Sequence, residues 1–132
     1  MILNKSRMLI ILIAILLFFQ ANCTNRVLKD NRKFGIEATE LRYKIDNRVP
    51  IALIDVRTTD EYYSGHIAGA KLFPAEDVFS NVNQLPQNKE IILYCSDGQR
   101  SLLVAKHLAA NGFTSVKRLN GGIKSWTWEL VR

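Results

Sequence analysis

One apolar run that ends at a cysteine limits most strongly what this chain can fold into. Ile91 to Tyr94 are four consecutive apolar residues that predict a buried strand, and Cys95 follows them directly. After a short polar loop, Ser101 opens a run to Ala110 in which apolar residues recur at helical spacing. A strand that leads through a short loop into a helix is the unit of a parallel α/β sheet. The cysteine is therefore expected at the carboxyl edge of such a sheet, where open α/β folds place their sites.

The chain beyond its N-terminal segment repeats this alternation of strand and helix. We predict a short strand at Ile36 and longer strands at 51–55, 70–73, 91–94 and 115–119. Helices are predicted at 37–46, 59–63, 75–82 and 101–110, followed by a short final helix that contains Trp126. Strands that alternate with helices predict a parallel sheet covered by helices on both faces.

The expected position of Cys95 favours a reactive thiolate. The first N–H groups of a helix lack backbone partners and carry the positive end of the helix dipole, so they stabilise an anion. Arg100 adds a fixed positive charge, and the thiolate is the nucleophilic form of cysteine. The alternative is a buried cysteine with no reaction to perform, because free cysteines are often inert core residues.

Three blocks of sequence resemble the single-domain rhodaneses, a family of sulfurtransferases. Residues 95–101 fit the family's C-x-x-G-x-R-S loop, and residues 53–70 resemble its D-V-R, E-Y and G-H-I-x-G-A segment. The glycine pair 121–122 with Trp126 is similar to the closing G-G and Trp. The blocks occur in the family's order over about residues 34–128. The resemblance implies a three-layer α/β fold with a central, mostly parallel, five-stranded sheet and helices on both faces.

The resemblance also implies a reaction. Cys95 would take a sulfane sulfur from a small anionic donor, such as thiosulfate, a persulfide or a polysulfide, and hold it as a persulfide. A thiol or cyanide would then accept the sulfur, in two half-reactions that require no cofactor. The loop residues expected to bind the substrate are Ser96, Asp97, Gly98, Gln99 and Arg100. For Arg100, anion steering and pairing with a carboxylate behind the loop both stay open.

Asp97 departs from the larger thiosulfate-using rhodaneses, which carry basic residues just after the cysteine. Here Ser96 and Asp97 occupy those places. A carboxylate beside the loop repels a dianionic donor and disfavours the thiolate, so a persulfide or polysulfide is expected to react more readily than thiosulfate. This expectation weakens if the Asp97 side chain points into solvent.

Other polar residues in the matching blocks are expected to support the site. We predict that Asp55, Arg57 and Glu61 form an ion-pair network that braces the sheet edge rather than an acid–base set. His66 is expected to be a buried hydrogen-bonding residue, and Ser101 to be a cap or first-turn residue of the helix. The remaining expectations are that His107 is exposed and that Trp126 and Trp128 pack in the core and at its rim.

Two other classes of function remain open. Small phosphatases and arsenate reductases have a related cysteine loop, but with five residues between Cys and Arg, whereas four separate Cys95 from Arg100. Tyr94 also stands where the phosphatase motif has His. Non-catalytic rhodanese-like binding modules form the second alternative, since fold does not fix function. A persulfide carrier that serves one partner protein lies between a module and an enzyme.

The N-terminal residues 1–22 have the composition of a signal peptide. Lys5 and Arg7 precede the apolar run 8–19, whose twelve residues fit a secretory segment better than the roughly 20 residues of a membrane span. An uncleaved membrane anchor remains the alternative. Either outcome predicts an exported protein in the periplasm or cell envelope.

Cys23 ends a sequence, LFFQANC, that resembles the lipobox of bacterial lipoproteins. Gln20 and Asn22 depart from the usual aliphatic and small residues of that motif. Lipidation of Cys23 would tether the mature protein to the membrane. Residues 23–33 are then a polar tether, and residues 34–132 are the folded rhodanese-like domain.

Composition limits the classes of fold and function that remain. The sequence has 132 residues, which suits one domain, and a net charge of +6. Its basic residues form no stripe with interleaved aromatics, so nucleic-acid binding is not expected. Two cysteines are too few for a disulfide scaffold, and no His/Cys cluster has zinc spacing, so no metal is expected either.

Overall fold

The computed structural model describes residues 5–132, which fall into two compact units. The first unit ends at Arg32, and the second comprises Lys33–Arg132. The first four residues of the expected signal peptide lie outside the described residues.

The first unit is helical. Helix α1 (Lys5–Phe34) runs through both the apolar segment and the expected polar tether, because the chain has no glycine or proline before Gly35 to end it. Its large apolar residues are exposed. The twelve-residue apolar run is thus part of a helix that is long and apolar enough to cross a membrane, a criterion that signal sequences near an N-terminus also meet.

The second unit is built on a five-stranded sheet in which every pair of neighbours is parallel. The strands lie in the order β1-β5-β4-β2-β3, which places β4 at the centre. Their bounds are β1 (Gly35–Ile36), β2 (Ile51–Asp55), β3 (Lys71–Leu72), β4 (Glu90–Tyr94) and β5 (Val116–Leu119). β3 is shorter than predicted, since only Lys71 and Leu72 pair with β2.

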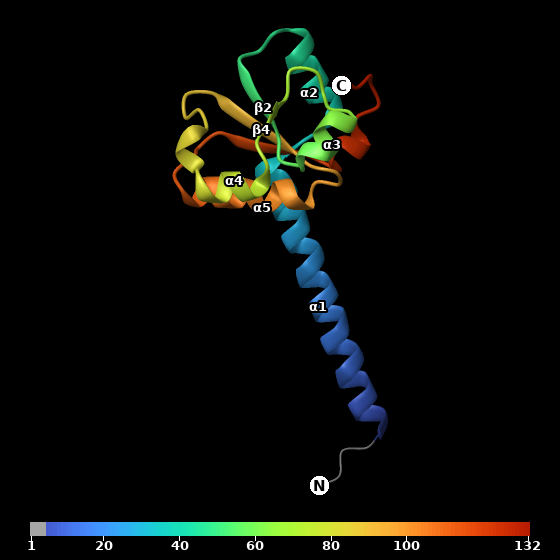
Figure 1. Ribbon diagram of the computed structural model, residues 1–132. Coiled ribbons are helices and arrows are strands. Elements are labelled where there is room, and N and C mark those ends of the chain that lie inside the picture. Colours follow the sequence, from blue (N-terminus) through green and yellow to red (C-terminus); the bar gives the residue numbers. More distant parts are fainter. Residues whose placement is uncertain (1–4) are drawn as a thin grey trace. The chain divides into compact units, whose positions relative to one another are not determined.

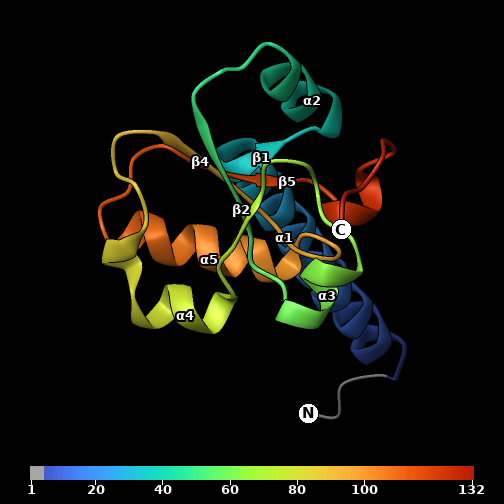
Figure 2. The same cartoon turned by 45° about the horizontal axis from the view of Figure 1, so that its top comes forward.

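Helices cover both faces of this sheet, so the three-layer α/β fold is confirmed (Figure 1). Helix α2 (Ala38–Asp46) lies on one face, whereas α4 (Ala75–Ser80) and α5 (Gln99–Ala110) lie together on the other, as a second view also shows (Figure 2). Three other helices complete the unit: α3 (Thr59–Ser64), η1 (Val82–Gln84) and η2 (Gly122–Ser125).

The alternation of side chains along β4 divides the core in two. Ile91, Leu93 and the following Cys95 pack with residues of α4 and α5. Ile92 and Tyr94 pack on the opposite face with residues of α2. Cys95 therefore emerges from the central strand on the side of α5.

Four further details differ from the prediction. Helix α4 ends at Ser80, two residues before the predicted end at Val82. Helix α5 begins at Gln99, two residues before Ser101. The final helix η2 ends at Ser125, and the backbone of Trp126 is extended, although its side chain is buried. His107 is not simply exposed but half-buried, because its ring packs edge-on against Phe79 with centroids 5.0 Å apart.

Two leucines of α5 offer a matched test of the core. Leu108 is completely buried, whereas Leu103 is 61% exposed. We expect Leu108→Ala to lower the free energy of unfolding by about 3 kcal/mol, because it leaves a cavity. Leu103→Ala should change it by less than about 0.5 kcal/mol. Urea unfolding of the full chain in detergent micelles, followed by tryptophan fluorescence, measures both values, and equal losses would contradict this packing.

Candidate active site

The loop between β4 and α5 points backbone N–H groups at a cysteine sulfur. Cys95 Sγ accepts the N–H of Gly98 at 3.2 Å and the N–H of Ser101 at 3.4 Å. The Ser101 hydroxyl lies 3.6 Å from Sγ and donates to the Gly98 carbonyl oxygen. We call this arrangement the sulfur cradle. Two amide donors and the first turn of a helix make it an environment that suits an anion on sulfur.

Gly98 makes the tight loop sterically feasible. Its φ of +93° is left-handed, and it is the N-terminal cap of α5. A Cβ at this position would lie 2.7 Å from Nη1 of the buried Arg118 on β5. The Asp97 side chain supports the same turn, because its Oδ1 accepts the N–H of Gln99 at 3.0 Å. These contacts explain why the helix starts earlier than predicted and why Arg100 lies in its first turn.

Helix η2 holds the carbonyl side of the loop. The N–H of Ile123 donates to the Cys95 carbonyl at 2.8 Å, and the N–H of Lys124 donates to the Ser96 carbonyl at 3.3 Å. A Cβ on Gly122 would lie 2.5 Å from the Cys95 carbonyl oxygen and 2.6 Å from the Asp97 nitrogen. The loop thus rests directly on the backbone of η2, with Gly98 and Ser101 donating to the sulfur on its other side.

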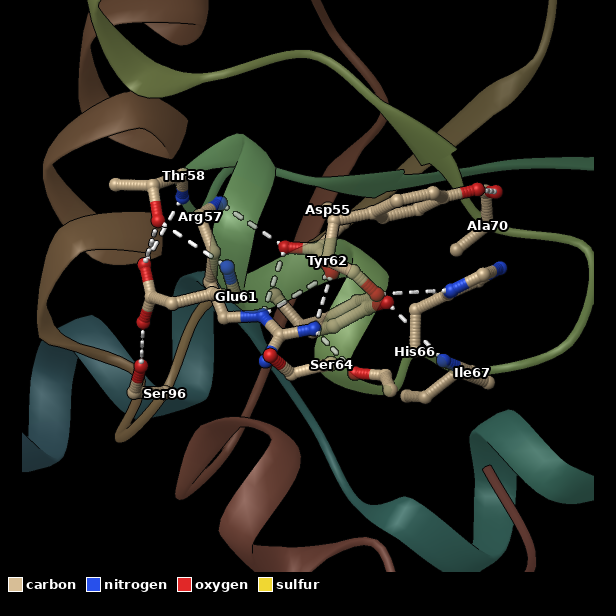
Figure 3. Close-up of polar contacts among 12 residues, drawn as sticks. Asp55, Arg57, Thr58, Glu61, Tyr62, Ser64, His66, Ile67, Ala70 and Ser96 are labelled. Carbon is tan, nitrogen blue, oxygen red and sulfur yellow. Dashed lines mark hydrogen bonds and ion pairs between the residues drawn. The ribbon is translucent and has the colours of Figure 1, made fainter. Parts of the chain in front are cut away.

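Glu61 joins α3 to the cysteine loop. Its carboxylate accepts the Ser96 hydroxyl at 2.7 Å and pairs with the Arg100 guanidinium at 3.2 Å. It also accepts the backbone N–H of Thr58 as the third residue of a capping box. Figure 3 shows Glu61 between Thr58 and Ser96. We call Glu61, Ser96 and Arg100 the carboxylate latch.

Hydrogen bonds control the titration of the latch. Partial burial alone would raise the pKa of Glu61, but the Thr58 amide, the hydroxyls of Ser96 and Thr58, and Arg100 lower it from 4.5 to about 2. The carboxylate therefore remains charged across the physiological pH range. Of the two roles left open for Arg100, the structure contains the pairing with a carboxylate.

The predicted network of Asp55, Arg57 and Glu61 is divided in two. Asp55 Oδ2 and Arg57 Nη2 form a buried pair at 2.6 Å, and Arg57 also donates to the Gly65 carbonyl at 2.8 Å. Figure 3 draws no bond between this pair and Glu61, which bonds to Thr58 and to Ser96 of the cysteine loop. Burial opposes the charge on Arg57, but the hydrogen bond and charge of Asp55 raise its pKa overall.

Tyr94 ties the turn around Ile67 to the sheet, and His66 packs on helix α3; neither side chain is bonded to the sulfur. The buried Tyr94 hydroxyl accepts the N–H of Ile67 at 3.2 Å. Burial, and then the nearby charge of Asp55, raise the pKa of Tyr94 above its ordinary value. The His66 ring is buried, stacks on Tyr62 with centroids 3.7 Å apart, and lies 3.1 Å from the Tyr62 carbonyl oxygen. His66 is thus a buried, hydrogen-bonding residue.

Of the other loop residues, Asp97 lies closest to the thiol. The residue is exposed, but its Oδ1 is 3.9 Å from Cys95 Sγ, so its charge is directed at the loop as well as at solvent. Gln99 is exposed and contributes its backbone N–H. Cys95 itself is only 1% exposed. Among residues 5–132 no group of three or more His, Cys, Asp or Glu side chains lies together as a metal site would require.

Sequence reasoning missed two parts of the site. Arg118, which packs under Gly98, was not singled out, although an arginine inside a predicted strand is an unusual residue that needs a partner. The contacts of η2 with the Cys95 and Ser96 carbonyls have no sequence signal beyond the glycine pair.

Comparison with known proteins gives the same fold and family. The family model of the rhodanese-like domain matches residues 37–129. Thiosulfate sulfurtransferase GlpE of Coxiella burnetii is 35% identical over 91 residues, which are 69% of this chain and 81% of GlpE. The putative sulfur carrier protein YrkF of Bacillus subtilis is 32% identical over 92 residues, 70% of this chain. The chain spans only 50% of YrkF and 59% of the uncharacterized Bacillus subtilis protein YqhL.

Solved structures agree. A rhodanese-like domain protein of Staphylococcus aureus superimposes with a TM-score of 0.66 at 33% identity, covering 74% of this chain and 96% of its own. A rhodanese-related protein of Thermoplasma volcanium gives a TM-score of 0.68 at 26% identity, covering 74% of this chain and 97% of its own. With most of its length matched in sequence and in fold, the chain belongs to the rhodanese-like domain family.

Proposed function

We propose that this protein is a sulfurtransferase that carries a sulfane sulfur on Cys95. The observation that supports this most directly is the pair of N–H donors from Gly98 and Ser101 on Cys95 Sγ. They stabilise negative charge on sulfur before and after sulfur is loaded. The relatives named as sulfurtransferases and as a sulfur carrier point to the same chemistry.

The reaction proceeds in two nucleophilic steps. The Cys95 thiolate attacks the outer sulfur of the donor, a new S–S bond forms, and the donor's own bond to that sulfur breaks with its electron pair leaving on the donor fragment. A thiol or cyanide then attacks the terminal sulfur of the persulfide, and Cys95 departs as a thiolate. No net oxidation and no cofactor is required.

The carboxylate latch positions the loop for these steps. Glu61 holds the hydroxyl of Ser96 and the guanidinium of Arg100, the two residues that flank the turn at Asp97 and Gly98. Because Arg100 is engaged by a carboxylate, it is poorly placed to clamp a phosphate. This contact favours sulfur transfer over the phosphatase and arsenate reductase alternatives.

Burial and charge favour a slender donor of low charge. Cys95 is 1% exposed and Asp97 Oδ1 lies 3.9 Å from its sulfur. A persulfide or polysulfide presents a narrow sulfur chain to such a site, whereas thiosulfate brings a bulky tetrahedral group with two negative charges close to the Asp97 charge. We therefore place persulfides and polysulfides ahead of thiosulfate, with carriage of sulfur for one partner protein as the second candidate.

We further propose that the protein is exported and held at the membrane, with the domain in the periplasm or cell envelope. Helix α1 has the length and composition of an anchor or signal sequence, and the exposed Cys23 lies within it. The mass of the purified cellular protein distinguishes a lipid on Cys23 at a new N-terminus from an uncleaved α1.

Mass spectrometry tests the central proposal. After exposure to polysulfide, the wild type should gain the mass of one sulfur on Cys95, and cyanide should remove it. Cys95→Ser should gain nothing and lose sulfur transfer, whereas Cys23→Ser, the matched cysteine control, should behave as the wild type. The absence of an adduct with polysulfide, persulfide and thiosulfate alike would leave a binding module as the remaining function.

Alanine variants of two glycines distinguish the cost of a left-handed backbone from the loss of support for the cysteine loop. Gly122 (φ +63°) and Gly112 (φ +89°) are both left-handed, but only a Cβ at Gly122 would collide with the cysteine loop; at Gly112 nothing lies within 4 Å. Each alanine variant should lose about 1 kcal/mol from the unfavourable φ. We expect Gly122→Ala also to slow sulfur transfer at least about tenfold, because displaced donors no longer meet the sulfur. Equal transfer rates in the two variants would contradict the role of η2.

The free energy of unfolding at acid pH tests the role of the carboxylate latch. The pKa of Glu61 is about 2 in the folded protein and about 4.5 when unfolded, so the unfolded state takes up the proton first. Its stabilisation is complete above about pH 5 and disappears as the pH falls through 4.5 toward 2. The wild type should therefore have a higher free energy of unfolding than Glu61→Gln above about pH 5. This difference should shrink as the pH falls from 4.5 toward 2. Glu129→Gln, at an exposed glutamate, should reproduce the wild-type profile in urea unfolding; a Glu61→Gln profile parallel to the wild type would refute the latch.

A further inference from the structure

The edge strand β3 leaves part of its neighbour uncovered. β2 pairs with β4 over all five residues from Ile51 to Asp55, but with β3 only at Ile54 and Asp55. Among the described residues, no other strand pairs with β2 over 51–53 on that side. In a parallel strand, alternate residues direct their N–H and C=O groups to opposite edges, so this stretch presents hydrogen-bonding groups without a strand partner.

A cavity of about 540 Å³ lies along this uncovered edge. Apolar side chains line it on one side of the sheet, including the half-buried Phe73 and the buried Leu85. Its volume falls within the range of ligand-binding pockets. Because Ile51 is in register with Glu90, and Asp55 with Tyr94, the cavity begins at the amino end of the sheet, opposite the end that carries the sulfur cradle.

The charge around this cavity has one sign. Lys71 and Lys89 are exposed and both line it, whereas no Asp or Glu does. Glu90, the acidic residue next to Lys89, is paired with Lys44 at 2.8 Å. Among the described residues, neither Lys71 nor Lys89 forms an ion pair. Both ammonium groups are therefore available to an acidic ligand.

We propose that this edge binds an extended, acidic peptide segment of a partner protein as an added strand. The segment would pair its backbone with β2 over 51–53, a length of about 10 Å that suits three residues. One apolar side chain would enter the cavity toward Phe73 and Leu85, and acidic side chains would meet Lys71 and Lys89. Backbone pairing explains the extended conformation, and the two lysines select the charge. The site is separate from Cys95 and does not depend on the proposed sulfur transfer.

Hydrogen exchange tests this proposal on the full chain in uncharged detergent micelles. The probe is a capped six-residue peptide that alternates aspartate and valine, and the control peptide replaces each aspartate with lysine. We expect the aspartate peptide to slow exchange in the fragment that contains residues 51–53 and to leave the fragment containing Cys95 unchanged. The lysine peptide should have no effect.

Charge reversal provides matched variants. Lys71→Glu combined with Lys89→Glu alters two exposed side chains and should weaken binding of the aspartate peptide at least about fivefold at low salt. Lys124→Glu, at an exposed lysine outside the cavity, should leave the affinity unchanged. Unaltered binding by the double variant, or no protection of residues 51–53 at millimolar peptide, would overturn the proposal. Protection that rises with protein concentration without peptide would also overturn it, because the occupant would then be a second copy of this chain.

Discussion

The contact between two backbone N–H groups and the sulfur of Cys95 is the interaction on which the site depends. It requires the chain to turn sharply after β4, so that the amides of Gly98 and Ser101 converge on one atom. Both donors are backbone N–H groups, so replacing a side chain does not remove either of them directly. The environment of the sulfur is therefore a property of loop geometry, and every residue that fixes the loop influences it.

Three supports act on that loop from different directions. Gly98 supplies a left-handed turn against Arg118, η2 binds the carbonyl oxygens of Cys95 and Ser96, and Glu61 holds the Ser96 side chain. The buried Asp55–Arg57 pair is not in direct contact with the sulfur, but it fixes the start of the segment that delivers Glu61. The result is a preorganised cradle in which few groups need to move when charge develops on sulfur.

The order of the strands and helices followed from the sequence, because apolar runs with strand and helix spacing reflect burial directly. The position of Cys95 at a strand end followed for the same reason. The partner of Glu61 could not be predicted in this way. Its contact with Ser96 spans 35 residues and depends on how α3 packs against the loop. The start of α5 was misplaced because Ser101 resembles a helix cap, whereas the turn is made by Gly98. Residues 23–33 were expected to be a polar tether because they lack an apolar period, although they continue the helix of the apolar run before them.

The dependence of the cradle on η2 also has a consequence for biosynthesis. Cys95 is translated well before Ile123 and Lys124, whose amides bind the carbonyls of Cys95 and Ser96. A nascent chain that has emerged only as far as α5 therefore has its thiol but lacks the contacts that set the loop. Cys95 therefore reaches its final environment only after η2 has left the ribosome.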